Sequence, residues 1–354
     1  MSVDGSSPLP PAPARAMPPP QPYAAQVAGH RGDTGKQYYG LLHRNDGKVL
    51  KPILKPTQAR EIAFYERLST STEPDLLELR LLTAKYYGTE RVVYNGVERE
   101  YIVMEDLAHG MLEPCIMDVK IGKRTWDPLA SEEKIAREQA KYSLCRQEYS
   151  FCIPGFQVYR QADGVLERHG KDYGKKLHGE AVKNALRTYL NGPRPPRSLI
   201  LRFLAPLWRL QRWSSRRRSL RLYCASLLLV YDAGRLRGGE GDGSKNKSKP
   251  NGLRKSSSAP AVDVHSLLPP STTHSSDTNI TNKICNIKRD YYATLQDLCN
   301  DGQERRPWVS LTVIDFAHAF FSEEEEHDYN FQEGIDSLVA VFEQLLKETD
   351  SYVR

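Results

Sequence analysis

The chain has 354 residues, of which 39% are hydrophobic and 27% are charged, so it can bury the core of one large domain or of two lobes. Its formal charge of +6, from 50 basic and 44 acidic residues, does not by itself indicate a nucleic-acid partner, although it allows a local basic patch that faces an anion. Six cysteines without any C-x-x-C spacing argue against a zinc ribbon, and they favour a reducing compartment over a disulfide scaffold. No apolar run reaches about 18 residues, and no signal sequence opens the chain, so we expect neither a transmembrane helix nor secretion.

Two segments have compositions that cannot form a core. Residues 1–35 contain "PLPPAPARAMPPPQP", which predicts a disordered, proline-rich tail. Residues 233–304 are mostly Gly, Ser, Lys, Pro and Thr, which predicts a mostly disordered insertion. The sequence does not indicate which proteins either segment would bind.

The first ordered unit is expected over residues 36–112. "YYGLLHRNDGKVLKPI" predicts two strands around an Asp46-Gly47 turn, and "RVVYNGVEREYIVMEDL" predicts two more around Asn95-Gly96. Between them, Arg60–Leu68 has the apolar spacing of a helix. This segment therefore reads as a small β-rich lobe that carries one helix.

A second, larger lobe is expected over residues 113–232 and 305–354. Residues 131–149 predict one helix capped by Ser131, and two further helices are expected at 182–190 and about 198–215. "GFQVYR", "ASLLLVYD" and "WVSLTVID" predict buried strands, and residues 334–348 predict an amphipathic closing helix. The expected fold class is α/β (α+β), with two lobes.

Charged residues interrupt several of these apolar strands. In "CIMDVKIG", Asp118 and Lys120 are two positions apart and therefore share one face of a strand. They form either a buried ion pair or a site for a charged ligand, because a buried charge needs a partner. Together with Lys51 and Asp315 they resemble the cations and carboxylates that phosphoryl transfer uses, and Glu61 could orient Lys51. The chain has no G-x-G-x-x-G loop and no H-R-D motif, which excludes an ordinary protein kinase.

The pattern P-x-x-x-D-x-K-x-G at residues 114–122 resembles the signature of the inositol phosphate kinase family, in its multikinase branch. The segments "VLKP", "REIAFYERL", "KYYG", "EDL", "LYCASLLLVYD" and "VIDFAHAF" follow in the order of that family. The resemblance implies a two-lobed fold distantly like that of protein kinases, with ATP between the lobes. It also implies an ATP-dependent kinase of the nucleus or cytoplasm that phosphorylates inositol tris- and tetrakisphosphate toward pentakisphosphate, with phosphoinositide head groups as an additional substrate.

The resemblance also implies roles for individual residues. Lys51 would hold the α- and β-phosphates, Asp118 would bind the ribose hydroxyls, and Asp315 would coordinate Mg²⁺. Lys120 would stabilise the transferred phosphoryl group or the attacking hydroxyl, which makes Lys120 and Asp315 the expected catalytic residues. The lobe connector would contact adenine through the backbone of Glu105 and Leu107, with Asp106 between them.

The expected substrate face follows the signature strand. On a continuous helix over 131–149, the residues Lys134, Arg137, Glu138 and Lys141 would share one stripe. Such a stripe is either solvated surface or a clamp for a polyphosphorylated ring, because Lys and Arg suit phosphate. By family position, Lys171 and His318 join this face, although a lone histidine after a strand can also be structural.

Several alternatives remain open from the sequence. The family often has arginine where this chain has Gln157, and paired serines where it has Ala225-Ser226, so the substrate preference is open. The alternative functions are an inositol hexakisphosphate kinase that makes pyrophosphates and a non-catalytic scaffold. The basic run Arg212–Arg221 could bind nucleic acid, but without interleaved aromatic residues it fits a helix end or a localisation signal better.

Overall fold

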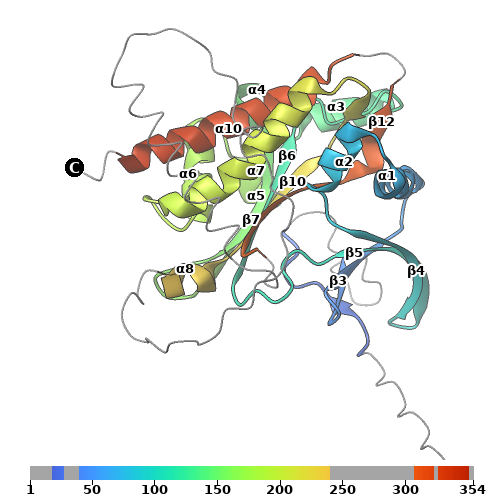
Figure 1. Cartoon of the computed structure of the whole chain (residues 1–354), viewed down its shortest axis with the longest axis horizontal. Coiled ribbons are helices and arrows are strands. Elements are labelled where there is room, and N and C mark those ends of the chain that lie inside the picture. Colours follow the sequence, from blue (N-terminus) through green and yellow to red (C-terminus); the bar gives the residue numbers. More distant parts are fainter. Residues whose placement is uncertain (1–17, 28–39, 240–306, 323–325, 351–354) are drawn as a thin grey trace, which may run out of the picture.

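Two antiparallel five-stranded sheets frame the molecule, which is described by a computed structural model (Figure 1). The structure describes residues 18–27, 40–239, 307–322 and 326–350. The first sheet and two helices form the smaller lobe, and the second sheet and most of the helices form the larger one. The two-lobed α/β fold expected from the sequence is therefore observed.

The first sheet has the strand order β1-β2-β3-β5-β4, and two tight hairpins build most of it. Asn95 and Gly96 have φ angles of 51° and 76°, which is the left-handed pair that a two-residue hairpin turn requires. Both hairpins and the first helix are as predicted. The elements of this lobe are β1 (Gln21–Pro22), β2 (Leu42–Arg44), β3 (Lys48–Pro52), β4 (Tyr86–Tyr94), β5 (Val97–Glu105), α1 (Gln58–Thr70) and α2 (Pro74–Arg80), of which α2 was not predicted.

The second sheet has the order β11-β10-β6-β7-β8, so the signature strand β6 lies at its centre. One face of β6 packs into the main core through Met117, Val119 and Ile121, which have no exposed surface. Helices α7 and α10 cover that face (Figure 1). The strands are β6 (Pro114–Ile121), β7 (Phe151–Tyr159), β8 (Leu166–His169), β10 (Ser226–Asp232) and β11 (Val309–Ile314), and the covering helices are α7 (Arg197–Arg216) and α10 (Tyr329–Asp350).

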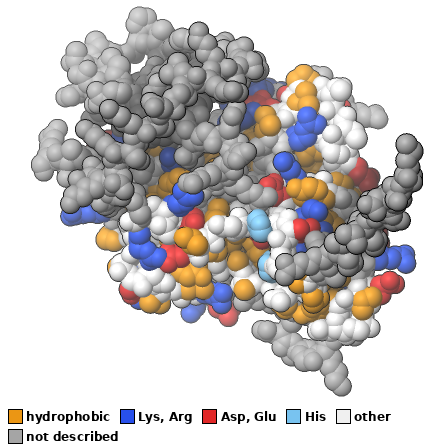
Figure 2. Space-filling model, turned by 60° about the horizontal axis from the view of Figure 1, so that its bottom comes forward, with side chains coloured by type: hydrophobic (Ala, Val, Ile, Leu, Met, Phe, Trp, Pro, Cys, Tyr) orange, Lys and Arg blue, Asp and Glu red, His pale blue; other side chains and the backbone are white. Residues whose placement is uncertain are grey.

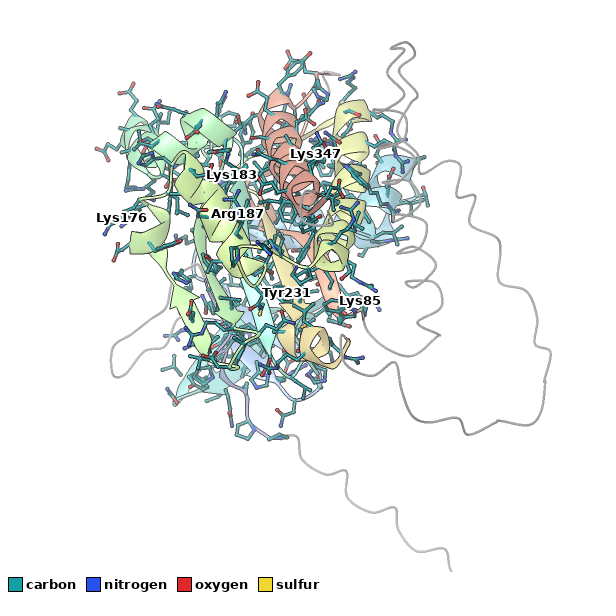
Figure 3. The ribbon with its side chains drawn as sticks, turned by 90° about the vertical axis from the view of Figure 1, so that its left-hand side faces the viewer. Lys85, Lys176, Lys183, Arg187, Tyr231 and Lys347 are labelled. Carbon is teal, nitrogen blue, oxygen red and sulfur yellow. The ribbon has the colours of Figure 1, made fainter. Side chains whose placement is uncertain are left out.

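The remaining elements surround this sheet. Figure 3 shows Lys183 and Arg187 on α6 beside α10, where the Arg187 guanidinium lies 2.9 Å from the Glu348 carboxylate. A short two-stranded sheet, β9 with β12, lies next to α1. These elements are α3 (Glu132–Ala140), α4 (Ser143–Tyr149), α5 (Lys171–Gly174), α6 (Glu180–Tyr189), α8 (Ala233–Gly239), β9 (Leu220–Leu222), β12 (Ala319–Phe321) and the 3₁₀ turn η2 (Phe316–His318).

The single helix predicted over residues 131–149 is wrong, because the chain breaks into α3 and α4. Tyr142 has a φ of 54°, which no right-handed helix contains. The buried Arg146 explains the break, since its guanidinium donates to the carbonyl oxygens of Glu138, at 2.8 Å, and of Lys141. Lys141 therefore lies beyond the end of α3, and the expected four-residue stripe is not continuous on one helix.

Part of the expected tail is ordered. Residues 18–27, which we call the strap, pair with β2 through β1 and continue toward the second sheet. The Tyr23 amide donates to the Leu41 carbonyl at 2.8 Å, and the Arg168 guanidinium on β8 donates to the Ala24 carbonyl at 3.2 Å. The strap therefore connects both sheets, while residues 1–17 and 28–35 lie outside the described residues.

The expected insertion also starts later than predicted, because residues 233–239 form α8. Residues 240–304 lie outside the described residues. The basic run near Arg212 belongs to the folded body: α7 ends at Arg216, whose guanidinium pairs with Glu78, and Arg217 is 1% exposed and lies 3.4 Å from Asp328. It is thus a helix end, as one of the alternatives proposed.

The surface mixes side chains of every kind. On the face turned forward in Figure 2, basic, acidic and hydrophobic side chains are interspersed around histidines near its centre. Within the described residues, none of the helices has both the length and the apolar composition needed to cross a bilayer.

Candidate active site

A cavity of about 460 Å³ lies between the two sheets, a size typical of small-molecule sites. Strands β3 and β5 and helix α1 contribute one side, and β6, β10 and the end of β11 contribute the other. The strap closes part of the rim. The residues discussed below that line this cavity are Tyr23, Gln26, Val27, Val49, Lys51, Glu61, Met104, Glu105, Asp106, Leu107, Asp118, Lys120, Cys224, Leu228, Asp315 and His318.

Lys51 is held between two carboxylates. Its Nζ lies 2.8 and 2.9 Å from the two oxygens of Glu61 on α1, and 2.8 Å from Oδ1 of Asp315. The pairing of Lys51 with Glu61 was predicted. The Glu61 side chain, on α1, is only 1% exposed. Burial alone would lower the pKa of Lys51, but Asp315 and Glu61 together raise it above its ordinary value. The lysine therefore stays charged.

Asp315 follows the last residue of β11, as the apolar run before it predicted. Its φ of 67° is a left-handed conformation, which aspartate tolerates better than most residues. The turn places its carboxylate in the cavity with 40% of the side chain exposed. Burial would raise the pKa of Asp315, but Lys51 and Lys120 lower it to about 2, so the carboxylate stays ionised.

Asp118 and Lys120 project from β6 into the same cavity, on the face opposite Met117 and Val119. Asp118 is 6% exposed, and its Oδ1 has no hydrogen-bond partner among the described residues. Burial, only partly offset by Lys120, raises the pKa of Asp118 to about 6. A buried carboxylate oxygen without a hydrogen-bond partner is costly, which indicates that a ligand completes the site at Oδ1.

Lys120 does not form a salt bridge with Asp118 in the described structure. Its Nζ instead donates to the carbonyl oxygen of Cys224 at 3.2 Å and to the Sγ atom at 3.3 Å. Burial would lower the pKa of Lys120, but Cys224 and Asp118 raise it, so the ammonium stays charged. Of the two interpretations of the signature strand, the geometry favours a site for a charged ligand over a direct ion pair.

In the lobe connector, residues 105–107, some polar groups form hydrogen bonds within the fold and others remain for the cavity. The Glu105 amide donates to Lys85 and the Asp106 amide donates to Gly47, each at 2.9 Å. The Asp106 carboxylate accepts from the Tyr23 hydroxyl at 2.8 Å and from the Ala108 amide at 3.0 Å, so this side chain stabilises the turn. Among the described residues, no backbone carbonyl accepts the Leu107 amide.

The expected substrate residues are only partly brought together. Lys120 and His318 line the cavity, whereas Lys134, Arg137 and Lys141 lie outside it on or just after α3. Lys134 is near enough to lower the pKa of His318. Lys171 is exposed at the start of α5 and does not line the cavity.

The residues of the two departures from the family pattern do not line the cavity, although Ser226 acts on the lining residue Asp118. Gln157 on β7 is 1% exposed, and its Nε2 donates to the Pro114 carbonyl at 2.9 Å. Ser226 is fully buried on β10 opposite Lys120 in the strand register. Gln157 therefore ties the start of β6 to its neighbour.

Sequence reasoning missed two parts of the site. The strap residues sit in a proline-rich segment, and composition gave no sign that they would pair with β2. Asp127, in "TWDPLA", pairs with His318, 191 positions away, which no local pattern reveals. Within the described residues, no group of three His, Cys, Asp or Glu side chains is arranged to hold a metal.

Comparisons with known proteins agree with this geometry. The inositol polyphosphate kinase family matches residues 101–343. The chain is 30% identical to inositol polyphosphate multikinase of Mus musculus over 92% of each chain. It is 35% identical to that of Homo sapiens over 60% of this chain, and this alignment spans about half (51%) of the human protein. It is 28% identical to inositol hexakisphosphate kinase 1 of Homo sapiens over 70% of this chain and 53% of that protein.

Solved structures have the same fold. The crystal structure of the inositol phosphate multikinase of S. cerevisiae in complex with ADP and Mn²⁺ superposes with a TM-score of 0.55 at 20% identity. That superposition covers 84% of this chain and 99% of the yeast chain. The resemblance read from the signature strand is thereby confirmed. The chain belongs to the inositol polyphosphate kinase family.

Proposed function

We propose that this protein transfers the γ-phosphoryl group of ATP to hydroxyl groups of inositol tris- and tetrakisphosphate, toward inositol pentakisphosphate. The observation that carries the proposal is the cavity between the two sheets. In it the buried Asp118, whose Oδ1 has no hydrogen-bond partner among the described residues, faces the same space as Lys120 and the Lys51–Asp315 pair. Phosphoryl transfer needs this combination of positioned cations and carboxylates rather than covalent chemistry by the protein.

The nucleotide is proposed to lie along the sheet edges. Val49, Met104 and Leu228 give apolar walls for adenine, and the Leu107 amide and the Glu105 carbonyl offer it hydrogen bonds. The Asp118 carboxylate accepts from the ribose hydroxyls, which supplies the partner that it lacks. Lys51, fixed by Glu61, contacts the α- and β-phosphates.

Asp315 is the proposed ligand of a divalent cation, which its carboxylate would hold beside the nucleotide phosphates. An ionised carboxylate beside the phosphate position fits Mg²⁺, which prefers hard oxygen ligands and retains several waters. When bound, the cation neutralises charge on the phosphates. A yeast relative was crystallised with ADP and Mn²⁺, which supports a divalent ion. Lys51 would then exchange part of its contact with Asp315 for phosphate oxygens.

Lys120 is the proposed stabiliser of the transferred group. Its ammonium is anchored by the Cys224 carbonyl, and its charge is retained despite burial. The inositol hydroxyl oxygen bonds to the γ-phosphorus while the bond from that phosphorus to the ADP oxygen breaks. In the transition state, negative charge is spread over the three equatorial oxygens of the transferred phosphoryl group. A fixed cation at that position lowers the barrier without reorganisation.

The substrate ring is proposed to bind at the Lys120–His318 end of the cavity, with Lys134, Arg137, Lys141 and Lys171 contacting its phosphates. Phosphoinositide head groups present the same phosphorylated ring and are a second proposed substrate. The greater identity to the multikinases, 30% and 35% against 28%, favours this activity over pyrophosphate synthesis. Retention of Lys51, Lys120 and Asp315 argues against a scaffold without catalysis.

The test is a product analysis with purified full-length protein, ATP, Mg²⁺ and inositol 1,4,5-trisphosphate. We expect ADP release that depends on the inositol phosphate, with tetrakis- and pentakisphosphate as products. Lys120→Met serves as the inactive control. Products only from inositol hexakisphosphate would favour the alternative kinase, and no turnover with any inositol phosphate would favour the scaffold.

A further inference from the structure

Asp127 lies in the loop between β6 and α3 and is 2% exposed. Its Oδ1 accepts from the Leu129 amide at 2.9 Å, which closes a tight turn. Its Oδ2 faces two cationic or donor groups: the Arg60 guanidinium, at 3.5 Å, and Nδ1 of His318. The carboxylate is therefore held in one orientation by groups from three different segments.

His318 is the last residue of η2 and lines the cavity together with Lys120. Its side chain is 18% exposed, and Asp127 occupies its Nδ1. Among the described residues, its Nε2 has no hydrogen-bond partner. Nε2 is thus the ring nitrogen left for a ligand in the cavity.

The pairing decides which ring nitrogen carries the proton. An ionised carboxylate can only accept, so Asp127 requires a proton on Nδ1, and a neutral imidazole then has its lone pair on Nε2. We propose that Asp127 is a positioning residue that holds His318 in the Nδ1–H form, so that Nε2 accepts the proton of the attacking inositol hydroxyl. This inference rests on the proposed function, because it concerns the acceptor of the same phosphoryl group.

The step is balanced as follows. The hydroxyl oxygen forms a bond to the γ-phosphorus while the bond between that phosphorus and the β,γ-bridging oxygen of ATP breaks, and the leaving electron pair stays on ADP. The hydroxyl proton moves to Nε2 of His318. The resulting imidazolium is stabilised by Asp127 on Nδ1 until the proton passes to solvent.

The charges around His318 are consistent with a neutral ring before reaction. Burial, together with the positive charges of Lys134 on α3 and Arg60 on α1, lowers its pKa, and Asp127 offsets part of this. The Asp315 carboxylate, which directly precedes η2, also interacts electrostatically with His318. Burial would raise the pKa of Asp127, but the hydrogen bond to His318 lowers it, so this carboxylate is ionised at neutral pH.

Asp127→Asn is the informative variant. The Leu129 amide keeps the side-chain oxygen at the Oδ1 position, so the new amide group donates to Nδ1 of His318. The ring proton must then move to Nε2, which abolishes the acceptor and retains the shape. The matched control is Asp163→Asn, because Asp163 also accepts a backbone amide two residues on, from Val165 at 3.1 Å, and pairs with an arginine, but it has no histidine partner.

The first measurement needs no turnover. Nitrogen-15 NMR of histidine-labelled protein, with the signal assigned through His318→Gln, should show Nδ1–H and an unprotonated Nε2 in the parent. The proton should lie on Nε2 in Asp127→Asn. A parent ring protonated at Nε2 would overturn the proposal, even if the variant failed to fold.

The second measurement is a double-mutant cycle on kcat with inositol trisphosphate. We expect Asp127→Asn to lower kcat by about 10²-fold, the contribution of a positioned base, with the KM for ATP unchanged. In a His318→Gln background, Asp127→Asn should lower kcat by less than about twofold, because the two residues act as a unit. An equal loss in both backgrounds would reduce Asp127 to a structural role. A parent without any inositol phosphate turnover would instead refute the proposed function and leave the NMR result to judge the pairing.

Discussion

The Nζ atom of Lys51 lies 2.8 Å from Oδ1 of Asp315, although 264 positions separate the two residues. The contact joins β3 of the first sheet to the end of β11 in the second, directly across the cavity. The Asp315 carboxylate therefore has two possible uses, as the partner of Lys51 in the free protein and as a cation ligand in the nucleotide complex. The two roles can be separated experimentally.

Asp315→Asn should leave the fold intact and remove most of kcat. Asparagine keeps the shape and one acceptor oxygen, and Lys51 retains Glu61 as its counter-charge, so we expect a melting temperature close to that of the parent. Loss of the carboxylate should also abolish the Mg²⁺-dependent part of ATP affinity. Melting temperature, kcat and a Mg²⁺ titration on one sample check this, with Asp172→Asn, whose side chain is 92% exposed, as the control. An active, magnesium-responsive variant would contradict the assignment.

The stability of the folded protein should depend on pH through the Asp118 carboxyl group. Its pKa in the folded protein is raised from 3.8 to about 6, so the ionised form costs up to about 3 kcal/mol of stability above pH 6. The cost disappears as the pH falls toward 4, since the folded state then binds the proton that the unfolded state lacks. Asp118→Asn should therefore melt at or above the parent at pH 7, with the difference shrinking below pH 6.

The same carboxyl sets the pH profile of binding. Because ribose hydroxyls donate to the ionised form, ADP affinity of the parent should weaken as the pH falls through about 6. The affinity of Asp118→Asn should be weaker at pH 7 and nearly independent of pH over this range. Calorimetric titration of both proteins with ADP between pH 5 and pH 8 measures this, and parallel profiles would remove Asp118 from the nucleotide site.

The strap should contribute to ATP binding. Removal of residues 1–27 deletes the wall formed by Tyr23, Gln26 and Val27 and the contacts that join the two sheets. We expect the KM for ATP to rise at least about fivefold, equivalent to about 1 kcal/mol, and the KM for inositol phosphate to change less. Removal of residues 1–17 alone is the matched control and should change neither. Equal ATP KM values for the two truncations would show that the strap is dispensable.

The lysines on and after α3 should act on the substrate and not on ATP. Lys134→Ala and Lys141→Ala should each raise the KM for inositol trisphosphate, since loss of a charge-assisted contact costs on the order of 1.5–3 kcal/mol. Lys134 is the stronger candidate because its charge already acts on His318, whereas Lys141 is 45% exposed and pairs with Glu138 at 2.7 Å. Lys347→Ala, at an exposed lysine in the last turn of α10 that does not line the cavity, is the control. Normal KM values would identify these lysines as solvated surface.

Short-range patterns in the sequence were sufficient for the framework. The Asn95-Gly96 turn, the alternation around Asp118 and Lys120, and the apolar stripe of α10 each depend on residues a few positions apart. Such patterns identify hairpins, strand faces and amphipathic helices because their physics is local. The signature strand identified the family from sequence for the same reason, because its two charges and its core-facing residues lie within nine positions.

Tertiary contacts decided what local patterns left open. The helix over 131–149 has good local propensity, yet the buried Arg146 takes the carbonyl groups that its continuation would need. The proline-rich strap is ordered because β2 and Arg168 supply partners from elsewhere in the chain. The pairs Lys51–Asp315 and Asp127–His318 form only when the sheets and the turn after β11 meet. A single sequence cannot show these pairings, because their energy comes from burial and charge compensation between segments that only the complete fold brings together.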